Sequence, residues 1–128
     1  MKKIAIILSG LLFTCLTSFA YNVTFKVDMS NVSGFSVANV NGTFNNWCGA
    51  CAAMTDANAD NIWEITIDLP AGTYEYKFTA DGWNQQENLT PGSACTVTNF
   101  GYTNRSITVS ADTVLPTVCW GACAACSN

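Results

Sequence analysis

Residues 62–78 read IWEITIDLPAGTYEYKF, and this stretch decides the fold class. Its apolar side chains occupy every second position, first at Trp63, Ile65, Ile67 and Leu69 and then at Tyr74, Tyr76 and Phe78. An alternation with a period of two indicates a strand that buries one of its faces. The Pro-Ala-Gly sequence at 70–72, between the two runs, is typical of a turn. We therefore expect two strands joined by a short turn, with most of these aromatic residues in the core.

The rest of the chain repeats this pattern of short strands and polar turns. Further strands are predicted at residues 23–29, 37–44, 96–100 and 105–109. No window after the first twenty residues has helical spacing. Short strands separated by Gly, Pro and Asn predict an all-β fold, an antiparallel immunoglobulin-like β-sandwich over residues 21–115. A domain of this size buries a modest core, so we expect disulfides to contribute to its stability.

The first twenty residues have the features of a secretory signal peptide. Lys2 and Lys3 precede an apolar run, and residues 18–20 supply small side chains at the two positions that a signal peptidase reads. The run is too short for a comfortable membrane span. Lipid attachment at Cys15 is the alternative, although the residues before it fit a lipidation motif poorly. We expect a mature chain that begins at Tyr21 and is secreted or displayed at the cell surface.

The charge of the predicted mature chain excludes one class of partner. Residues 21–128 carry three basic and nine acidic side chains, which gives a formal charge of −6, and the sequence has no histidine. Nucleic-acid binding draws most of its affinity from Lys and Arg, so nucleic acid is not expected as a partner. An acidic surface rich in Asn and Thr suits a neutral polar ligand better.

Six cysteines remain after residue 20, and their even number in an exported chain predicts three disulfides. They are Cys48, Cys51, Cys95, Cys119, Cys123 and Cys126. Zinc is the rival interpretation, because two pairs have the Cys-x-x-Cys spacing of metal ligands. The tail at residues 116–128 has little strand pattern, and we expect its cysteines to hold it on the domain. We further predict at least one bond from Cys48 or Cys51 to the tail cysteines.

Two tryptophans depart from the core pattern. Trp47 follows Asn45 and Asn46, and Trp83 follows an Asp-Gly pair at 81–82. A large apolar ring in a polar loop is costly to leave in water unless it covers something. Sugar rings present C–H faces that pack on indole, and their hydroxyl groups pair with amides and charged groups at the rim. The alternative is that each ring folds back to cover one end of the sandwich.

Four segments now carry a family resemblance. They are VNGTFNNW at 40–47, IWE at 62–64, LPAGTYEYKF at 69–78 and DGW at 81–83. In this order they resemble the starch-binding modules, especially the glycogen-binding domain of the AMP-activated kinase β subunit and the N-terminal modules of branching enzymes. The resemblance extends over residues 23–109.

The resemblance implies a carbohydrate site and its residues. In that family two tryptophans stack on successive glucose units of an α-1,4-glucan, while a lysine and an asparagine bind the hydroxyl groups. The matching positions here are Trp47, Trp83, Lys77 and Asn104. Trp83 follows its Asp-Gly pair directly, whereas the kinase module has one residue between them. Lys77 also fits from pattern alone, because it points to the strand face opposite Tyr76.

A loop with the spacing of calcium ligands is the one candidate cofactor site. Asp56, Asn58 and Asp60 place side-chain oxygens at alternate positions, as a calcium loop does. The loop lacks the glycine and the bidentate glutamate of an EF-hand, and the alternative is a polar turn before the next strand. No other cofactor is expected.

These features predict a non-catalytic module that binds an α-glucan such as starch, glycogen or maltooligosaccharides. A histidine-based nucleophile is excluded because the chain has no histidine. The scattered carboxylates give no sign of a glycosidase pair. The alternative is a secreted structural or adhesive protein that self-assembles through the edges of the sandwich, with the strand at 23–29 as an exposed edge.

Overall fold

The computed structural model describes residue 10 and residues 19–127. The expectations for the signal peptide at 1–20 and for Cys15 therefore fall almost entirely outside the described residues. No helix in the described part of the chain has the length and apolar character needed to cross a membrane.

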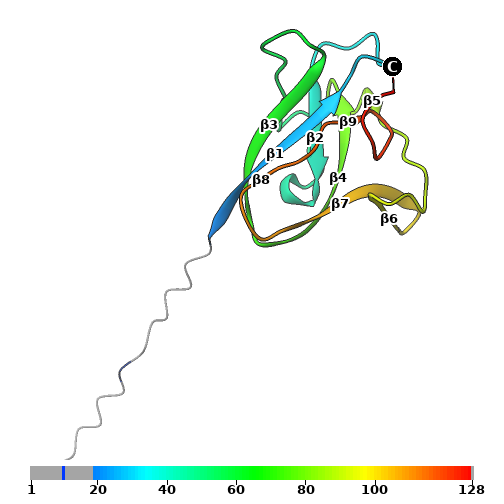
Figure 1. Ribbon diagram of the computed structural model, residues 1–128. Helices are drawn as coiled ribbons and strands as arrows, with labels where there is room; N and C mark the ends of the chain where they lie inside the picture. Colours follow the sequence, from blue (N-terminus) through cyan, green and yellow to red (C-terminus); the bar gives the residue numbers. More distant parts are fainter. Residues whose placement is uncertain (1–9, 11–18, 128) are drawn as a thin grey trace, which may run out of the picture.

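Nine strands and one short 3-10 helix make up the described fold (Figure 1). In chain order they are β1 (Ala20–Asp28), β2 (Ala38–Gly42), η1 (Thr43–Asn45), β3 (Ile62–Pro70), β4 (Gly72–Ala80), β5 (Gln85–Gln86), β6 (Thr96–Asn99), β7 (Tyr102–Val109), β8 (Thr113–Val114) and β9 (Val118–Cys119). The six strands expected from the sequence are all present, within a few residues of their predicted ends. The three additional strands, β5, β8 and β9, have two residues each.

The strands form two sheets that pack face to face, as a sandwich requires. The first sheet has the order β3-β1-β8, with β9 also paired to β1. The second has the order β2-β4-β7-β6, with β5 paired to β4 beyond the end of β7. Every pairing is antiparallel except those of β8 and β9 with β1. The predicted all-β sandwich is confirmed.

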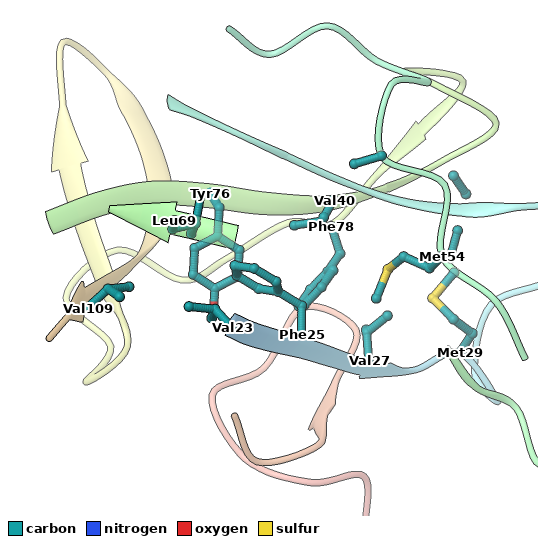
Figure 2. Close-up of a cluster of buried hydrophobic side chains, with 13 residues drawn as sticks. Val23, Phe25, Val27, Met29, Val40, Met54, Leu69, Tyr76, Phe78 and Val109 are labelled. Carbon is teal, nitrogen blue, oxygen red and sulfur yellow. The ribbon is translucent and has the colours of Figure 1, made fainter. Parts of the chain in front are cut away.

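The core lies between the inner faces of the two sheets. Val23, Phe25 and Val27 of β1 point toward side chains of β2 and β4 (Figure 2). The Phe25 ring meets the Tyr76 ring edge to face, with 5.0 Å between the ring centroids. The alternation that predicted β4 thus places Tyr76 inside, and it turns the intervening side chains of β4 to the opposite face.

Strand β1 is not an edge of its sheet, and the sequence-based expectation for residues 23–29 is wrong on this point. The chain after β7 runs back along β1 and pairs with it in parallel as β8 and β9. The amide of Leu115 donates to Thr24 O at 2.9 Å, and the amide of Trp120 donates to Asp28 O at 3.3 Å. Two-residue strands are too short to show a period of two, so β8 and β9 could not be predicted from the sequence pattern.

The six cysteines form three pairs, Cys48–Cys51, Cys95–Cys123 and Cys119–Cys126. The predicted bond between the Trp47 loop and the tail is wrong, because the loop closes on itself. The reason lies in the strand order: Cys48 and Cys51 follow β2, while Cys95 precedes β6, and these two strands are opposite edges of one sheet. The tail reaches the β6 edge and bonds there.

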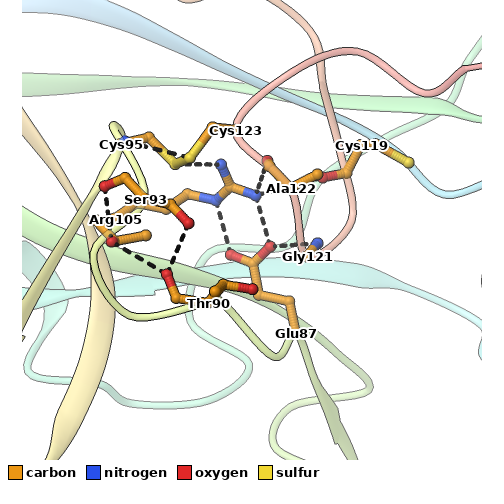
Figure 3. The surroundings of a disulfide bond; sticks show 10 residues. Glu87, Thr90, Ser93, Cys95, Arg105, Cys119, Gly121, Ala122 and Cys123 are labelled. Atoms are coloured by element: carbon orange, nitrogen blue, oxygen red, sulfur yellow. Dashed lines mark hydrogen bonds and ion pairs between the residues drawn. A yellow bond between two sulfur atoms is a disulfide. The ribbon is translucent and has the colours of Figure 1, made fainter.

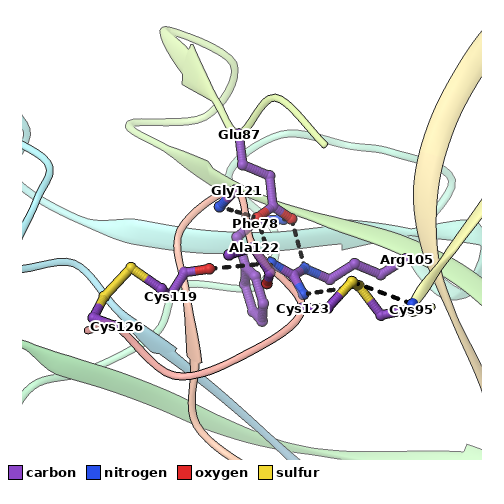
Figure 4. A network of polar contacts seen from close by, with 9 residues as sticks. All are labelled: Phe78, Glu87, Cys95, Arg105, Cys119, Gly121, Ala122, Cys123 and Cys126. Atoms are coloured by element: carbon purple, nitrogen blue, oxygen red, sulfur yellow. Dashed lines mark hydrogen bonds and ion pairs between the residues drawn. A yellow bond between two sulfur atoms is a disulfide. The ribbon is translucent and has the colours of Figure 1, made fainter. Parts of the chain in front are cut away.

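A buried ion pair joins the tail to the second sheet, in addition to the disulfides (Figure 3). The Arg105 guanidinium donates to both carboxylate oxygens of Glu87, at 2.7 and 2.8 Å, and the two residues are 1% and 0% exposed. Arg105 also donates to Ala122 O at 2.9 Å, and Glu87 accepts the amide of Gly121 at 3.0 Å (Figure 4). Because tail main-chain groups complete this pair, the tail is part of the folded domain.

Candidate functional site

A groove of about 460 Å³ lies on the outer face of the second sheet. Its lining comes from the outward-facing positions of β4 and β7, the loops after β2 and β4, strand β5, and the β6–β7 hairpin. The lining residues are Thr43, Trp47, Glu75, Lys77, Trp83, Gln86, Asn99, Phe100, Tyr102 and Asn104. The structure therefore brings together all four residues that the resemblance implied, although they are spread over 58 positions of the chain.

Trp83 stands on a tight turn that follows β4. Asp81 and Gly82 both have left-handed backbone angles, with φ of 48° and 69°. The Asp81 carboxylate holds the turn, because it accepts the amides of Ser36 and Val37 at 2.9 to 3.1 Å. Gly82 supplies the second left-handed position without a steric cost. The turn directs the Trp83 ring into the groove, where 42% of the residue stays exposed.

Trp47 is held by the main chain that leaves β2. Its amide donates to Gly42 O at 3.1 Å, which closes the turn after η1. Behind this turn, the fully buried Asn41 bonds both main-chain groups of Gly49, at 2.7 and 2.9 Å. A buried amide with both of its ends satisfied fixes the loop strongly. The Cys48–Cys51 pair closes the same loop on its exposed side.

The two indole rings form one tilted platform. Their centroids are 6.4 Å apart and their planes differ by 35°. The indole N–H of Trp83 donates to the main-chain oxygen of Trp47 at 3.0 Å, so the Trp47 loop helps to position the Trp83 ring. Neither residue belongs to the core cluster or packs against it. The alternative that these rings fold back to cover the ends of the sandwich does not agree with this arrangement.

Polar side chains form the floor of the groove. Lys77 and Glu75 occupy successive outward positions of β4, and Asn104 faces outward from β7. Lys77 Nζ donates to Gln86 Oε1 at 3.4 Å. The Asn104 amide nitrogen donates to Glu75 at 3.3 Å. The predicted outward orientation of Lys77 is confirmed, because its neighbour Tyr76 is buried on the other face.

The β6–β7 hairpin adds two aromatic side chains that the sequence analysis missed. Phe100 and Gly101 form its turn, both with left-handed backbone angles of 53° and 82°. Phe100 is fully exposed, and Tyr102 is 71% exposed. An aromatic residue is rare at such a turn position, and full exposure of its ring carries a solvation cost. The signal in the sequence was the pattern Phe-Gly-Tyr at 100–102, between two short strands.

The loop at 56–60 forms a network with its own main chain. The two oxygens of the Asp56 carboxylate accept the amides of Asp60 and Asn61, at 3.1 and 3.0 Å. The amide of Ile62 donates to Asp60 and lowers the pKa of that carboxyl below its usual value. No group of three Cys, Asp or Glu residues in the described chain is gathered as a metal ion would require. The calcium site stays a prediction.

Known proteins and protein families show what the chain is similar to. A family model described as the glycogen recognition site of AMP-activated protein kinase matches residues 21–115. An alpha-amylase of Niallia circulans is 36% identical over 107 residues, which cover 77% of this chain and 8% of the amylase. The chain thus spans a small part of that protein's length, so the similarity concerns one segment of the amylase.

Proposed function

The chain belongs to the family of the glycogen recognition site of AMP-activated protein kinase, and from this premise we propose that it is an exported module that binds α-1,4-glucans on Trp47 and Trp83. Carbohydrate binding is the property that the family supports. The observation that carries the finer proposal is the tilted pair of indole rings above a floor that contains Lys77 and Asn104.

The tilt between the rings suits a curved chain of sugars. Glucose units present flat C–H faces to an aromatic ring, and successive units of an α-1,4-glucan turn gradually along the chain. Two rings inclined by 35° can each accept one such face. An open groove buries only part of its ligand, so we expect weak affinity, on the order of micromolar to millimolar dissociation constants.

Export is supported by the chemistry of the cysteines. All six cysteines after residue 20 are paired in the structure. Disulfides persist in oxidising compartments and are rare in a reduced cytoplasm. We therefore place the protein outside the cytoplasm, as the sequence of residues 1–20 also predicts.

The groove favours binding over hydrolysis. Glycoside hydrolases use two carboxyl groups on either side of the scissile bond. Among the residues that line the groove, Glu75 has the only carboxyl group, and both of its oxygens accept side-chain amides. We expect no release of sugar when the protein is incubated with maltoheptaose.

Electrophoresis in gels that contain glycogen tests the proposal. We expect glycogen to retard the wild-type protein. The double substitution of Trp47→Ala and Trp83→Ala should abolish this retardation. Val114→Ala is the control, because Val114 is an exposed apolar side chain on the first sheet, outside the groove. Retardation that survives the double substitution would remove this site. A protein that no α-glucan retards would remove the ligand class.

A further inference from the structure

The groove contains one negative and one positive side chain, and they are neighbours on the same face of β4. Glu75 and Lys77 are the only charged residues of its lining. They form no ion pair within 4 Å in the described structure, where the recorded pairs are Lys26–Glu64 and Arg105–Glu87. The two charges therefore cancel in the sum over the lining, although the two side chains form no direct ion pair.

Glu75 holds two asparagine side chains at once. Its Oε2 accepts the amide nitrogen of Asn99 at 3.2 Å, and its Oε1 accepts the amide nitrogen of Asn104 at 3.3 Å. An ionised carboxylate only accepts hydrogen bonds, so it must face the nitrogen of each amide and not the oxygen. Asn99 comes from β6 and Asn104 from β7, which means that one carboxylate of β4 orients side chains from two other strands.

The orientation leaves the amide oxygens available. Within the described residues neither Asn99 Oδ1 nor Asn104 Oδ1 has a hydrogen-bond partner. Every buried side-chain oxygen or nitrogen of the described residues does have a partner. The amide oxygen of Asn104 therefore reaches solvent, although the residue as a whole is only 8% exposed. This part of the floor presents acceptors, which pair with the hydroxyl hydrogens of a sugar.

We propose that Glu75 is the positioning and specificity residue of the groove: it turns the amide oxygens of Asn99 and Asn104 toward the ligand, and it makes the groove select neutral over anionic glucans. This inference rests on the proposed function. The negative charge of Glu75 balances the positive charge of Lys77 in the groove lining. Without Glu75 the groove keeps a lone cation, which attracts carboxylated sugars.

Glu75→Gln removes the charge of Glu75 but keeps the length and shape of the side chain. It therefore tests the positioning and specificity roles without leaving a gap in the groove. A glutamine amide has one acceptor and one donor end. It can hold one asparagine as before, while the other asparagine must reverse its amide and present nitrogen to the ligand. Glu64→Gln is the matched control, since it removes the same charge from the exposed outer face of the first sheet.

A double-mutant cycle with maltoheptaose tests the positioning role. Calorimetry should show that Glu75→Ala and Asn104→Ala each weaken binding about tenfold, as expected for hydrogen bonds that involve a charged group. The double variant should be little weaker than either single variant, because Glu75 acts on the ligand through Asn104. Effects that multiply in the double variant would overturn the positioning role, since independent residues add in free energy.

A second ligand tests the specificity role. The probe is a maltooligosaccharide oxidised at C6, so that it carries carboxylate groups. Glu75→Gln should raise the affinity for this probe relative to maltoheptaose by at least about threefold, and Glu64→Gln should leave the ratio unchanged. An unchanged ratio in Glu75→Gln would overturn the specificity role. If the wild-type protein binds no maltoheptaose, the proposed function is overturned together with this inference. If the wild type binds but the effects of Glu75→Ala and Asn104→Ala are independent of each other, the inference alone is overturned.

Discussion

The indole N–H of Trp83 donates a hydrogen bond to the main-chain carbonyl oxygen of Trp47, with 3.0 Å between the two heavy atoms. The two rings come from the loops that follow β2 and β4, and they are 36 positions apart. This bond ties the Trp83 ring to the main chain of the Trp47 loop, and the two ring planes meet at 35°. The platform is thus assembled before a ligand arrives, which reduces the entropy lost on binding.

Trp83→Phe should weaken glucan binding more than Trp47→Phe. Both variants keep an aromatic face, but only the first removes a hydrogen bond, because the Trp47 indole N–H has no partner within the described chain. A hydrogen bond contributes about 1 kcal/mol, so we expect an extra loss of about fivefold in affinity for maltoheptaose. Calorimetric titration of the two variants measures the difference. Equal losses would mean that the bond does not organise the platform.

Gly49→Ala should disturb the same pair of indole rings, because Gly49 lies against the Trp83 ring. Gly49 has a φ of 89°, and an added Cβ atom would lie 3.2 Å from Cδ1 of Trp83. Gly92→Ala is the control, because Gly92 has a similar φ of 81° with nothing within 4 Å of the added atom. Both substitutions should cost about 1 kcal/mol of stability through backbone strain. Only Gly49→Ala should also weaken binding, and glucan titration of both variants distinguishes steric contact from strain.

The buried pair of Arg105 and Glu87 should be a major determinant of stability. Arg105→Met leaves the Glu87 carboxylate buried without its cation, which typically costs about 3–5 kcal/mol. It also removes the bond to Ala122 O that holds the tail. Urea denaturation of the variant measures this loss. A change below about 1 kcal/mol would show that solvent reaches Glu87 and replaces the guanidinium.

The three disulfides should differ in their contribution to stability. The closed loops have sequence separations of 28 for Cys95–Cys123, 7 for Cys119–Cys126 and 3 for Cys48–Cys51. Restriction of the unfolded chain grows with loop length, so replacing the first pair by serines should cost roughly 3–4 kcal/mol and the last roughly 1.5 kcal/mol. Denaturation midpoints of the three double-serine variants should follow this order. The reverse order would point to effects in the folded state.

Much of the fold was predictable because the strand signal is local. Residues 62–78 show which side chains of β3 and β4 face inward, and this also places Lys77 on the outer face. Cysteine pairing was not predictable, because it depends on which strands become sheet edges. Glu87 and Arg105 were missed for a related reason. A charged residue reads as exposed in a sequence pattern, and only the fold shows that the two side chains meet.

The candidate site was predictable to a lesser degree. Trp47 and Trp83 are identifiable because a tryptophan in a polar loop is unusual. Glu75 had no such signal, since a glutamate at an outward strand position is ordinary. Its role depends on Asn99 and Asn104, and these residues approach it only when β6, β7 and β4 lie side by side. The sequence pattern predicts a strand end at Phe100, whereas the chain turns at that residue.

Alkaline pH should destabilise the protein through Tyr76. Burial raises the pKa of Tyr76 to about 12 from the usual value of 10, although the nearby Arg105 opposes the shift. Between pH 10 and pH 12 the unfolded chain therefore binds fewer protons than the folded chain. The free energy of unfolding is unaffected by this group below pH 10 and should fall by up to about 1.4 kcal/mol per pH unit above it, roughly 3 kcal/mol in all.

Tyr76→Phe is the variant that isolates this effect. The Tyr76 hydroxyl has no hydrogen-bond partner among the described residues, so phenylalanine keeps the packing against Phe25 and removes only the titration. Urea denaturation at pH 9, 10, 11 and 12 gives the free energy of unfolding for both proteins. The wild type should lose stability relative to the variant as the pH rises above 10, because all other titrating groups are common to the two. Parallel curves would show that the pKa of Tyr76 is not raised in the folded protein.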